Sequence, residues 1–234
     1  MDDTEMPVST AVRPQLEFLH MVYPAVLAFG DPSFIHSTYF LDFKQLKTLK
    51  IAYTGGERPG DAQELCLVCP NVPHVYIDIL CNSAYSLYNS VNYLLRAHAR
   101  ESLLDLSRFT ALEHLTVEGV LKVRSFHQRI LIDYFQTPIP WVVEILTVIS
   151  ISSRSAETLA KLTLKLSFID FQLSLIPHLH INWVALCSTL AVRNFPNFVV
   201  LNLQITGLPP SLLAKLKEDE VLVEMQKERK LVYI

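Results

Sequence analysis

Cysteine is scarce in this chain, with four in 234 residues, too few for a disulfide framework. No asparagine opens an N-x-Ser/Thr sequon, so the sequence gives no sign of N-glycosylation. The first residues, MDDTEM, are acidic where a secretory signal is basic, and Pro24 and Gly30 interrupt the apolar stretch that follows. The sequence therefore predicts a cytoplasmic or nuclear protein.

Charge is also low and nearly balanced. Charged residues make up 18% of the chain and the net charge is -3, so no basic excess attracts nucleic acid or an anionic membrane. The longest apolar run, 141–151, contains Glu144 and is far shorter than the roughly 20 residues that cross a bilayer. We therefore expect a soluble protein that binds neither nucleic acid nor membrane.

The common catalytic and nucleotide-binding motifs are missing as well. The chain has no G-x-S-x-G, Walker loop, G-x-G-x-x-G or H-E-x-x-H. The glycine-rich run 55–60 lacks the lysine and hydroxyl residue of a phosphate-binding loop, so it is typical of a turn. The sequence predicts a protein that is not an enzyme and that needs no cofactor.

Two groups of residues resemble metal ligands. Cys66 and Cys69 form a C-x-x-C with His74 and Cys81 nearby, which resembles a zinc or redox motif. Cysteine is among the most commonly buried residues, so core packing is the stronger interpretation. His178 and His180 have no carboxylate close in sequence, and they indicate a loop or a strand edge. No metal site is expected from either group.

What recurs is an aliphatic triplet with the spacing L-x-x-L-x-L. Its clearest copy is Leu112, Leu115 and Val117, a short apolar run that predicts a strand with alternate side chains directed into a core. The chain is 50% hydrophobic, which suffices for a large core. The triplet recurs at 46, 49 and 51, at 72, 75 and 77, at 159, 162 and 164, and at 198, 201 and 203.

Helical patterns separate these expected strands. They cover 61–70, 89–100, 141–150, 182–194 and 211–228, and the tail 231–234 is expected to be a closing strand. A helix or turn pair is expected between residues 16 and 29, and a serine-rich turn at 150–155.

The predicted fold class is α/β, as a leucine-rich-repeat-like solenoid of parallel strands with helical crossovers. Each strand-helix unit is too small to bury its own apolar face, so neighbouring units must stack. The repeats are long and irregular, because the middle aliphatics lie 26, 40, 47 and 39 residues apart. Residues 42–234 form this expected domain, and residues 1–41 form a poorly defined N-terminal segment.

The polar residues between the aliphatics are the candidate site. In a solenoid they share the inner face of the sheet, which such proteins commonly use for binding. The simpler interpretation is the solvated side of a half-buried sheet. The candidate protein-binding residues are Thr48, Lys50, Tyr76, Asp78, Thr116, Glu118, Thr163, Lys165, Asn202 and Gln204.

Three segments carry a family resemblance: LDLSRFTALEHLTVEG at 104–119, the pattern of 181–205, and the ending VLVEMQKERKLVYI at 221–234. Here Trp183 precedes a helix and the F-P-x-F run 195–198 opens a strand. In these features the chain resembles the leucine-rich-repeat-like region of fungal, especially basidiomycete, F-box-type proteins.

The resemblance implies a non-catalytic protein-interaction module that recruits a substrate to a cullin-type ubiquitin ligase. Residues 1–45 contain no recognisable F-box, so a cullin-type partner is expected only if an F-box is supplied or replaced. The alternative is a structural or scaffold repeat protein with no ubiquitin-ligase link, and an unrecognised enzyme is a third hypothesis.

Overall fold

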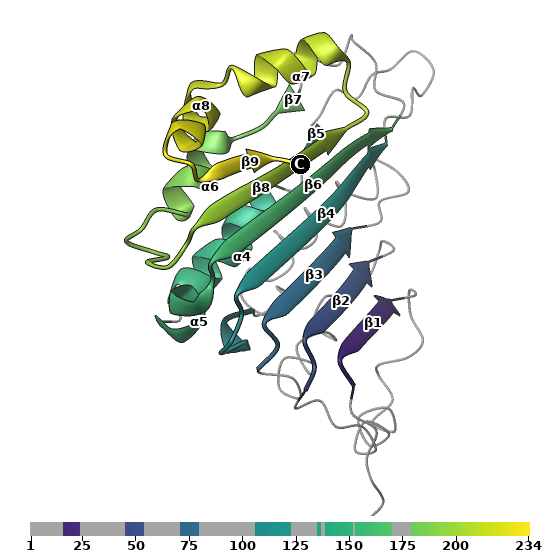
Figure 1. Ribbon diagram of the computed structural model, residues 1–234. Coiled ribbons are helices and arrows are strands. Elements are labelled where there is room, and N and C mark those ends of the chain that lie inside the picture. Colours follow the sequence, from purple (N-terminus) through teal and green to yellow (C-terminus); the bar gives the residue numbers. More distant parts are fainter. Residues whose placement is uncertain are drawn as a thin grey trace, which may run out of the picture.

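The computed structural model describes residues 16–23, 45–53, 71–79, 106–122, 135–136, 139–151, 153–169 and 179–234. Its main feature is a seven-stranded sheet in which every pairing is parallel (Figure 1). In spatial order the strands are β1 (Phe18–Tyr23), β2 (Thr48–Tyr53), β3 (His74–Ile79), β4 (His114–Lys122), β6 (Lys161–Ile169), β8 (Val200–Thr206) and β9 (Leu231–Tyr233). The fold is therefore α/β with an open parallel sheet.

The register of the sheet aligns the aliphatic triplets. Leu49, Val75, Leu115, Leu162 and Leu201 occupy one continuous row across five neighbouring strands, as the sequence predicts. The triplet residues are all 8% exposed or less. This burial defines the register, because a slip of one residue would turn the aliphatic side chains to the other face.

Backbone hydrogen bonds at the strand entrances repeat from one unit to the next. The amide N–H groups of residues 47 and 48 both donate to the Glu17 carbonyl, and those of residues 113 and 114 both donate to the Pro73 carbonyl. The same pair of hydrogen bonds recurs from the amides of residues 160 and 161 to the Glu113 carbonyl, and from those of residues 199 and 200 to the Ala160 carbonyl. Successive turns thus stack on one another in the same way as the strands.

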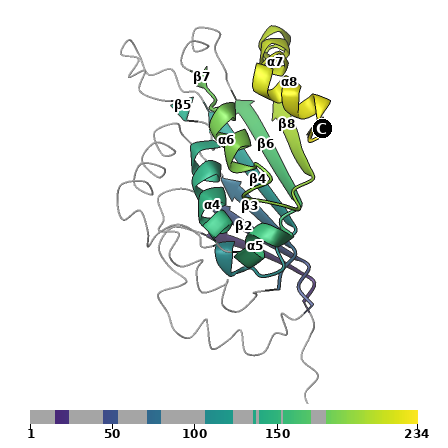
Figure 2. The same cartoon turned by 90° about the vertical axis from the view of Figure 1, so that its left-hand side faces the viewer.

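The helices that pack on the sheet cover one of its faces (Figure 2). They are α4 (Ile139–Ile151) and α6 (Trp183–Thr189), with the short α5 (Ser153–Thr158) and the 3₁₀ turn η3 (Leu106–Arg108) beside α4. Two more helices, α7 (Pro210–Lys217) and α8 (Glu220–Lys227), lie at the β9 end. A separate parallel pair joins β5 (Phe135–Gln136) to β7 (Leu179–His180).

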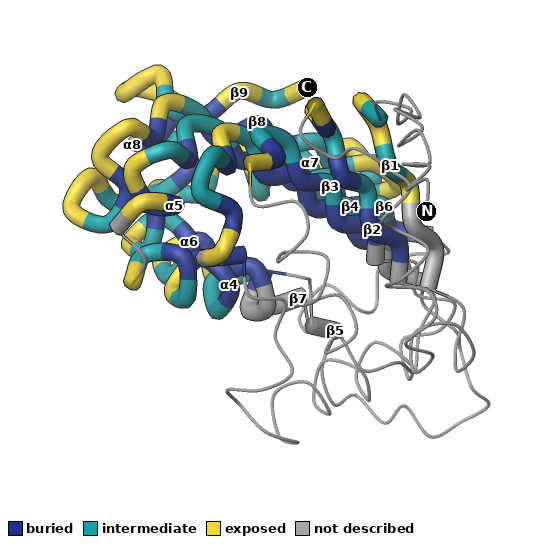
Figure 3. Tube along the Cα trace, turned by 90° about the horizontal axis from the view of Figure 1, so that it is seen from below, coloured by how far each residue is buried: buried dark blue, intermediate teal, exposed yellow. Residues whose placement is uncertain are grey.

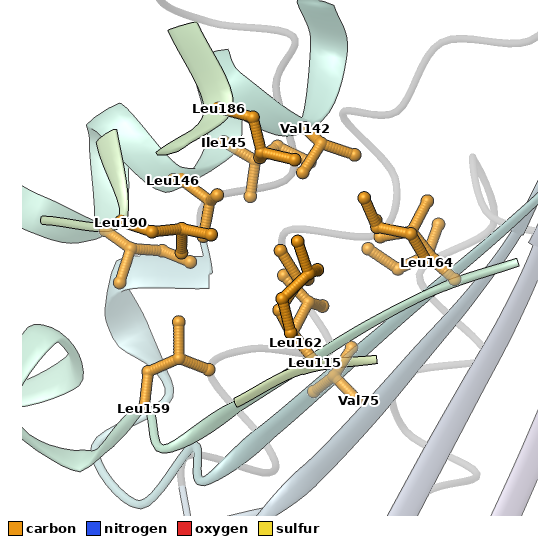
Figure 4. Packing of buried hydrophobic residues seen from close by; sticks show 14 of the residues in the cluster. Val75, Leu115, Val142, Ile145, Leu146, Leu159, Leu162, Leu164, Leu186 and Leu190 are labelled. Carbon is orange, nitrogen blue, oxygen red and sulfur yellow. The ribbon is translucent and has the colours of Figure 1, made fainter. Parts of the chain in front are cut away.

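The core lies between the sheet and α4 and α6. Figure 4 shows Val142, Ile145 and Leu146 of α4 directed toward Leu115 and Leu162 of the strands. The burial colours follow the same division, with much of the central strands β3, β4 and β6 dark blue and much of α8 yellow (Figure 3). Removal of this aliphatic surface from water is the main stabilising term, at about 25 cal/mol per Å².

Strand order in the sheet follows chain order, so each connection steps to the next position in the same direction. Right-handed crossovers that all step the same way place their helices on the same side of a sheet. Parallel sheets are usually covered on both faces. Here no helix among the described residues covers the face opposite α4 and α6, and we call this surface the open face.

Two local expectations were wrong and one boundary differs. The helix or turn pair expected from residue 16 is instead strand β1, because Leu16, Leu19 and Met21 repeat the triplet spacing and β1 pairs in register with β2. The expected serine-rich turn contains helix α5. The helix expected over 211–228 breaks into two, because the Asp219 side chain accepts hydrogen bonds from the amides of residues 221 and 222 and starts α8.

Some of the other expected elements are confirmed, and others lie outside the described residues. The closing strand is confirmed as β9, paired with β8. Helix α6 lies within its expected range, and α4 extends beyond the expected 141–150 at both ends. Asn182 caps α6 by accepting from the Ala185 amide. The helices expected at 61–70 and 89–100 lie outside the described residues.

Candidate functional site

The open face carries three rows of side chains that cross the strands. The pairing register gives the first row as Phe18, Thr48, His74, His114, Lys161 and Val200, the second as His20, Lys50, Tyr76, Thr116, Thr163, Asn202 and Val232, and the third as Ala52, Asp78, Glu118, Lys165 and Gln204. Because side chains alternate along a strand, all of these point away from the aliphatic core.

The ten residues named from the sequence all lie on this face. Five of them share the second row, four share the third, and Thr48 stands in the first. Thr48 precedes the middle aliphatic of its strand and pairs with His74, whereas Lys50 pairs with Tyr76. In the other strands the candidates were taken only after the middle aliphatic, so His74, His114 and Lys161, which precede it, were not among them.

The centre of the open face is an aromatic and charged network around Tyr76. The Tyr76 hydroxyl donates to the Glu118 carboxylate on the neighbouring strand. The Lys50 and Lys165 ammonium nitrogens lie 4.5 and 5.1 Å from the centre of the tyrosine ring, within the range of a cation–π interaction. Lys165 also lies 4.0 Å from Glu118 Oε2. The network spans β2, β3, β4 and β6, so one surface feature joins four strands.

Asp78 completes this network on the β2 side. Its Oδ2 atom lies 3.1 Å from Lys50 Nζ, and the residue is only 7% exposed. Its row neighbours are Ala52 and Glu118, so two carboxylates stand side by side with a lysine on each flank. The pairing of opposite charges restrains these side chains.

A second network joins the first two rows through histidine and threonine. The rings of His74 and His114 stack with centroids 4.2 Å apart and planes 8° apart. Each ring places its Nε2 next to a threonine hydroxyl, at 3.0 Å for Thr116 and 2.9 Å for Thr163. Asn202 Nδ2 lies 3.3 Å from the Thr163 hydroxyl and extends the chain to β8.

The two threonine hydroxyls link the rings to one another and to β8. The Asn202 amide donates to the Thr163 oxygen, which also lies within hydrogen-bond distance of His114 Nε2. The Thr116 oxygen lies 3.0 Å from His74 Nε2 and 3.3 Å from His114 Nε2. A hydroxyl can both donate and accept, so these contacts fit either tautomer of the rings.

Burial and positive neighbours keep the two rings neutral. Burial is the main cause that lowers the pKa of His114 from 6.5 to about 4, followed by His74 and by Lys161 and Lys165. Burial also lowers the pKa of His74, with the same two lysines as further causes. A stacked pair of imidazolium rings beside Lys161 would place three positive charges together.

The first prediction concerns acid. Because the pKa of His114 is lower in the folded chain than its ordinary 6.5, the unfolded chain binds more protons between pH 6.5 and about 4. The free energy of unfolding is therefore expected to be highest above pH 6.5 and to fall as the pH drops through that window.

Thermal melts of the wild-type chain and of a His74→Gln, His114→Gln variant from pH 7.5 to 4 measure this contribution. The variant is expected to lose part of the pH dependence, whatever other groups titrate. Parallel curves for the two proteins would show that the histidine pair does not couple folding to protons.

The metal-like groups of the sequence lie mostly outside the described residues. This holds for Cys66, Cys69, Cys81 and His178, whereas His180 belongs to the short strand β7. His74 lies on β3, where its ring stacks on His114. Within the described part of the chain, no three His, Cys, Asp or Glu side chains gather closely enough to hold a metal ion. Nor is any described helix long and apolar enough to span a bilayer.

Comparison with known proteins gives no further identification. No family model matches this chain, and neither a curated protein nor a solved structure matches it.

Proposed function

We propose that this chain is a non-catalytic protein-recognition module, a leucine-rich-repeat-like solenoid that binds a partner protein across its open face. The observation that carries the proposal is the pre-ordered network around Tyr76, set on the face of the parallel sheet that no described helix covers. Binding spreads over several strands and does not depend on a single pocket.

Support for the solenoid comes from repetition. Strand order follows chain order, the triplets align in one register, and the same pair of backbone bonds recurs at the strand entrances. These are the features expected when small units stack only on their neighbours. The concave or open side of such a stack is then the surface that remains for a partner.

The chemistry of the open face favours a protein partner. Lys50, Lys161 and Lys165 alternate with Asp78 and Glu118, a mixed pattern that complements the mixed charges of a protein surface better than a polyanion. Tyrosine near the centre of a binding surface commonly carries much of the binding energy. The contacts that hold Tyr76 and its lysines in place reduce the entropy lost on binding.

The family resemblance supplies the biological context of the proposal. It supports recognition of a substrate for a cullin-type ubiquitin ligase, with the F-box supplied or replaced by another protein. The alternative is a structural or scaffold role without a ligase link. The ligase context and the scaffold role are distinguished by which proteins no longer bind when residues of the open face are substituted.

The second prediction tests the open face by charge reversal. Glu118→Lys and Lys165→Glu are each expected to leave the fold intact, because these side chains are partly exposed and surface ion pairs contribute about 0–1 kcal/mol. Each is expected to weaken partner binding about tenfold or more, because like charges then face one another across the interface.

Quantitative affinity purification from the native organism measures the effect, with circular dichroism melts to verify folding. The double variant, Glu118→Lys with Lys165→Glu, restores an ion pair but keeps the reversed surface, so it should remain deficient in binding. Lys215→Glu, on the exposed side of α7, is the matched control and should bind as wild type.

Three outcomes distinguish the ligase context, protein recognition without a ligase, and the scaffold role. Loss of a cullin-ligase component and its substrate from the open-face variants supports the ligase context. Loss of other proteins supports recognition without that link. An unchanged set of partners in every variant contradicts a recognition role for the open face and favours the scaffold alternative.

A further inference from the structure

A second concave surface lies between α6 and α8, away from the open face. It is a groove of about 480 Å³ that lies within the common size range of ligand sites, about 300–1,000 Å³. None of its lining residues belongs to the three rows of the open face. They come from α6 and the turn after it, from Phe198, and from α8 with Lys230.

The floor of the groove is apolar. Leu190, Phe198 and Met225 line it and are largely buried, whereas Val192 is 58% exposed at its edge. Cys187 of α6 also lines the floor, with its Sγ 2.9 Å from Met225 Sδ of α8. Burial, and to a smaller extent Asp219, raises the pKa of the Cys187 thiol to about 11, so the thiol stays uncharged at neutral pH.

One rim of the groove is acidic. Glu220 and Glu224 of α8 and Glu228 at its C-cap follow one another at intervals of four, so they share one side of the helix, and all three are exposed. Lys230 pairs with Glu228 at 2.8 Å, and Lys227 pairs with Glu224 at 3.5 Å. With Lys227 and Lys230 counted beside the three glutamates, the rim carries one excess negative charge, and only Glu220 has no lysine partner among these pairs.

We propose that this groove binds a basic amphipathic helical segment of a partner protein. Apolar side chains of the segment pack on Leu190, Phe198 and Met225, and lysine or arginine side chains face the glutamates of α8. A helix laid in an apolar groove is recognised by apolar anchors at helical spacing, with charge fixing its orientation. The proposal uses residues separate from the open face and does not rest on the function proposed for it.

The competing occupant within reach is a second copy of this chain. Helix α7 carries Lys215 and Lys217, no acidic residue, and the half-buried Leu212 and Leu213. Its own apolar side already packs against the core through Leu216, so its insertion into another molecule would require undocking. For this reason a separate partner segment is the occupant that we infer.

The test uses a fluorescent synthetic peptide with leucines at helical spacing and lysines at the remaining positions. Two further peptides are controls, one with glutamates in place of the lysines and one with glycines in place of the leucines. Fluorescence anisotropy with the full chain is expected to detect binding of the leucine-lysine peptide alone, with an affinity that falls as salt rises.

The location of the bound peptide can be read from methionine methyl groups. The chain has four methionines, of which Met225 lines the groove, while Met1, Met6 and Met21 belong to the first strand or precede it. With ¹³C-methyl methionine, the peptide is expected to shift the Met225 resonance, assigned with Met225→Leu, and to leave the other three in place.

Variants separate the floor from the rim. Val192→Asp places a charge at the apolar edge and is expected to abolish peptide binding, whereas Val184→Asp, at a 64% exposed position of α6 outside the groove, should bind as wild type. Glu220→Gln, Glu224→Gln and Glu228→Gln combined are expected to weaken binding about tenfold, as for three surface charge pairs. Lys165→Glu on the open face should leave peptide binding unchanged.

Binding of the leucine-lysine peptide with a Met225 shift, lost in Val192→Asp but not in Val184→Asp, supports the proposal. Equal binding of the leucine-glutamate peptide, or equal binding by the Val192→Asp variant, overturns it. If sedimentation shows that the chain self-associates and that the leucine-lysine peptide dissociates the oligomer, the groove binds a second copy of the chain. That result would also overturn the proposal. Melting curves of each variant show whether a lost signal comes from unfolding.

Discussion

Leu115→Ala is expected to lower the free energy of unfolding by about 2–5 kcal/mol, the range measured for buried leucines that leave a cavity. Leu115 has no exposed surface and occupies the middle of the sheet, between Val75 of β3 and Leu162 of β6. Figure 4 places these side chains opposite those of α4 and α6. The neighbours are held by strands on both sides, so they have little freedom to collapse into the space.

The measurement is a thermal or urea melt of the purified variant. For a chain of this size, about 2–4 °C per kcal/mol corresponds to a melting temperature lower by roughly 4–20 °C. Glu113→Ala, at an exposed residue immediately before the same strand, is the control and should change stability by less than about 0.5 kcal/mol. A Leu115→Ala protein as stable as wild type would contradict the register described above.

That register shows which parts of the fold the sequence predicts well. A period of two in aliphatic residues is a local property of a strand, so five triplets were enough to predict five strands and their inward residues. Strand β1 carries the same spacing at Leu16, Leu19 and Met21, but prolines on both sides obscured it. Its partner β2 supplies the hydrogen bonds that make it a strand, and pairing across a long connection leaves no local signal.

The candidate site was predictable as a face and less so as a set of contacts. Alternation alone assigns Tyr76, Glu118 and Lys165 to the polar side of their strands. Which residues stand beside one another depends on the register between strands, and the residues that precede the middle aliphatics of β3, β4 and β6 were not among the candidates. The stacking of His74 on His114 could not be predicted, because the two histidines are 40 positions apart in the chain.

The groove illustrates the same limit for helices. The alternating acid and base of 215–230 is typical of a solvated helix face, and α8 indeed exposes its glutamates. The apolar floor beneath them comes from Cys187, Leu190 and Phe198, which precede α8 by more than twenty residues. Only the packing of α6 beside α8 combines the two into one surface.

Gly207→Ala is expected to destabilise the chain by about 3–5 kcal/mol, because alanine at this position is unfavourable for two independent reasons, its backbone conformation and a steric overlap. Gly207 follows β8 with a φ of +79°, a conformation that residues with a Cβ rarely adopt. A Cβ added there would also lie 1.8 Å from the backbone oxygen of Phe168, at the end of the neighbouring strand β6. Backbone on two strands would have to move to relieve that overlap.

Gly207→Asn separates the two grounds, since asparagine tolerates a positive φ better than alanine does but brings the same Cβ. If the close approach to Phe168 dominates, both variants should melt far below wild type and within a few degrees of each other in parallel thermal scans. If Gly207→Asn melts near wild type while Gly207→Ala does not, the constraint is the backbone conformation alone. In that case the ends of β6 and β8 can move apart far enough to accept a Cβ next to the Phe168 carbonyl.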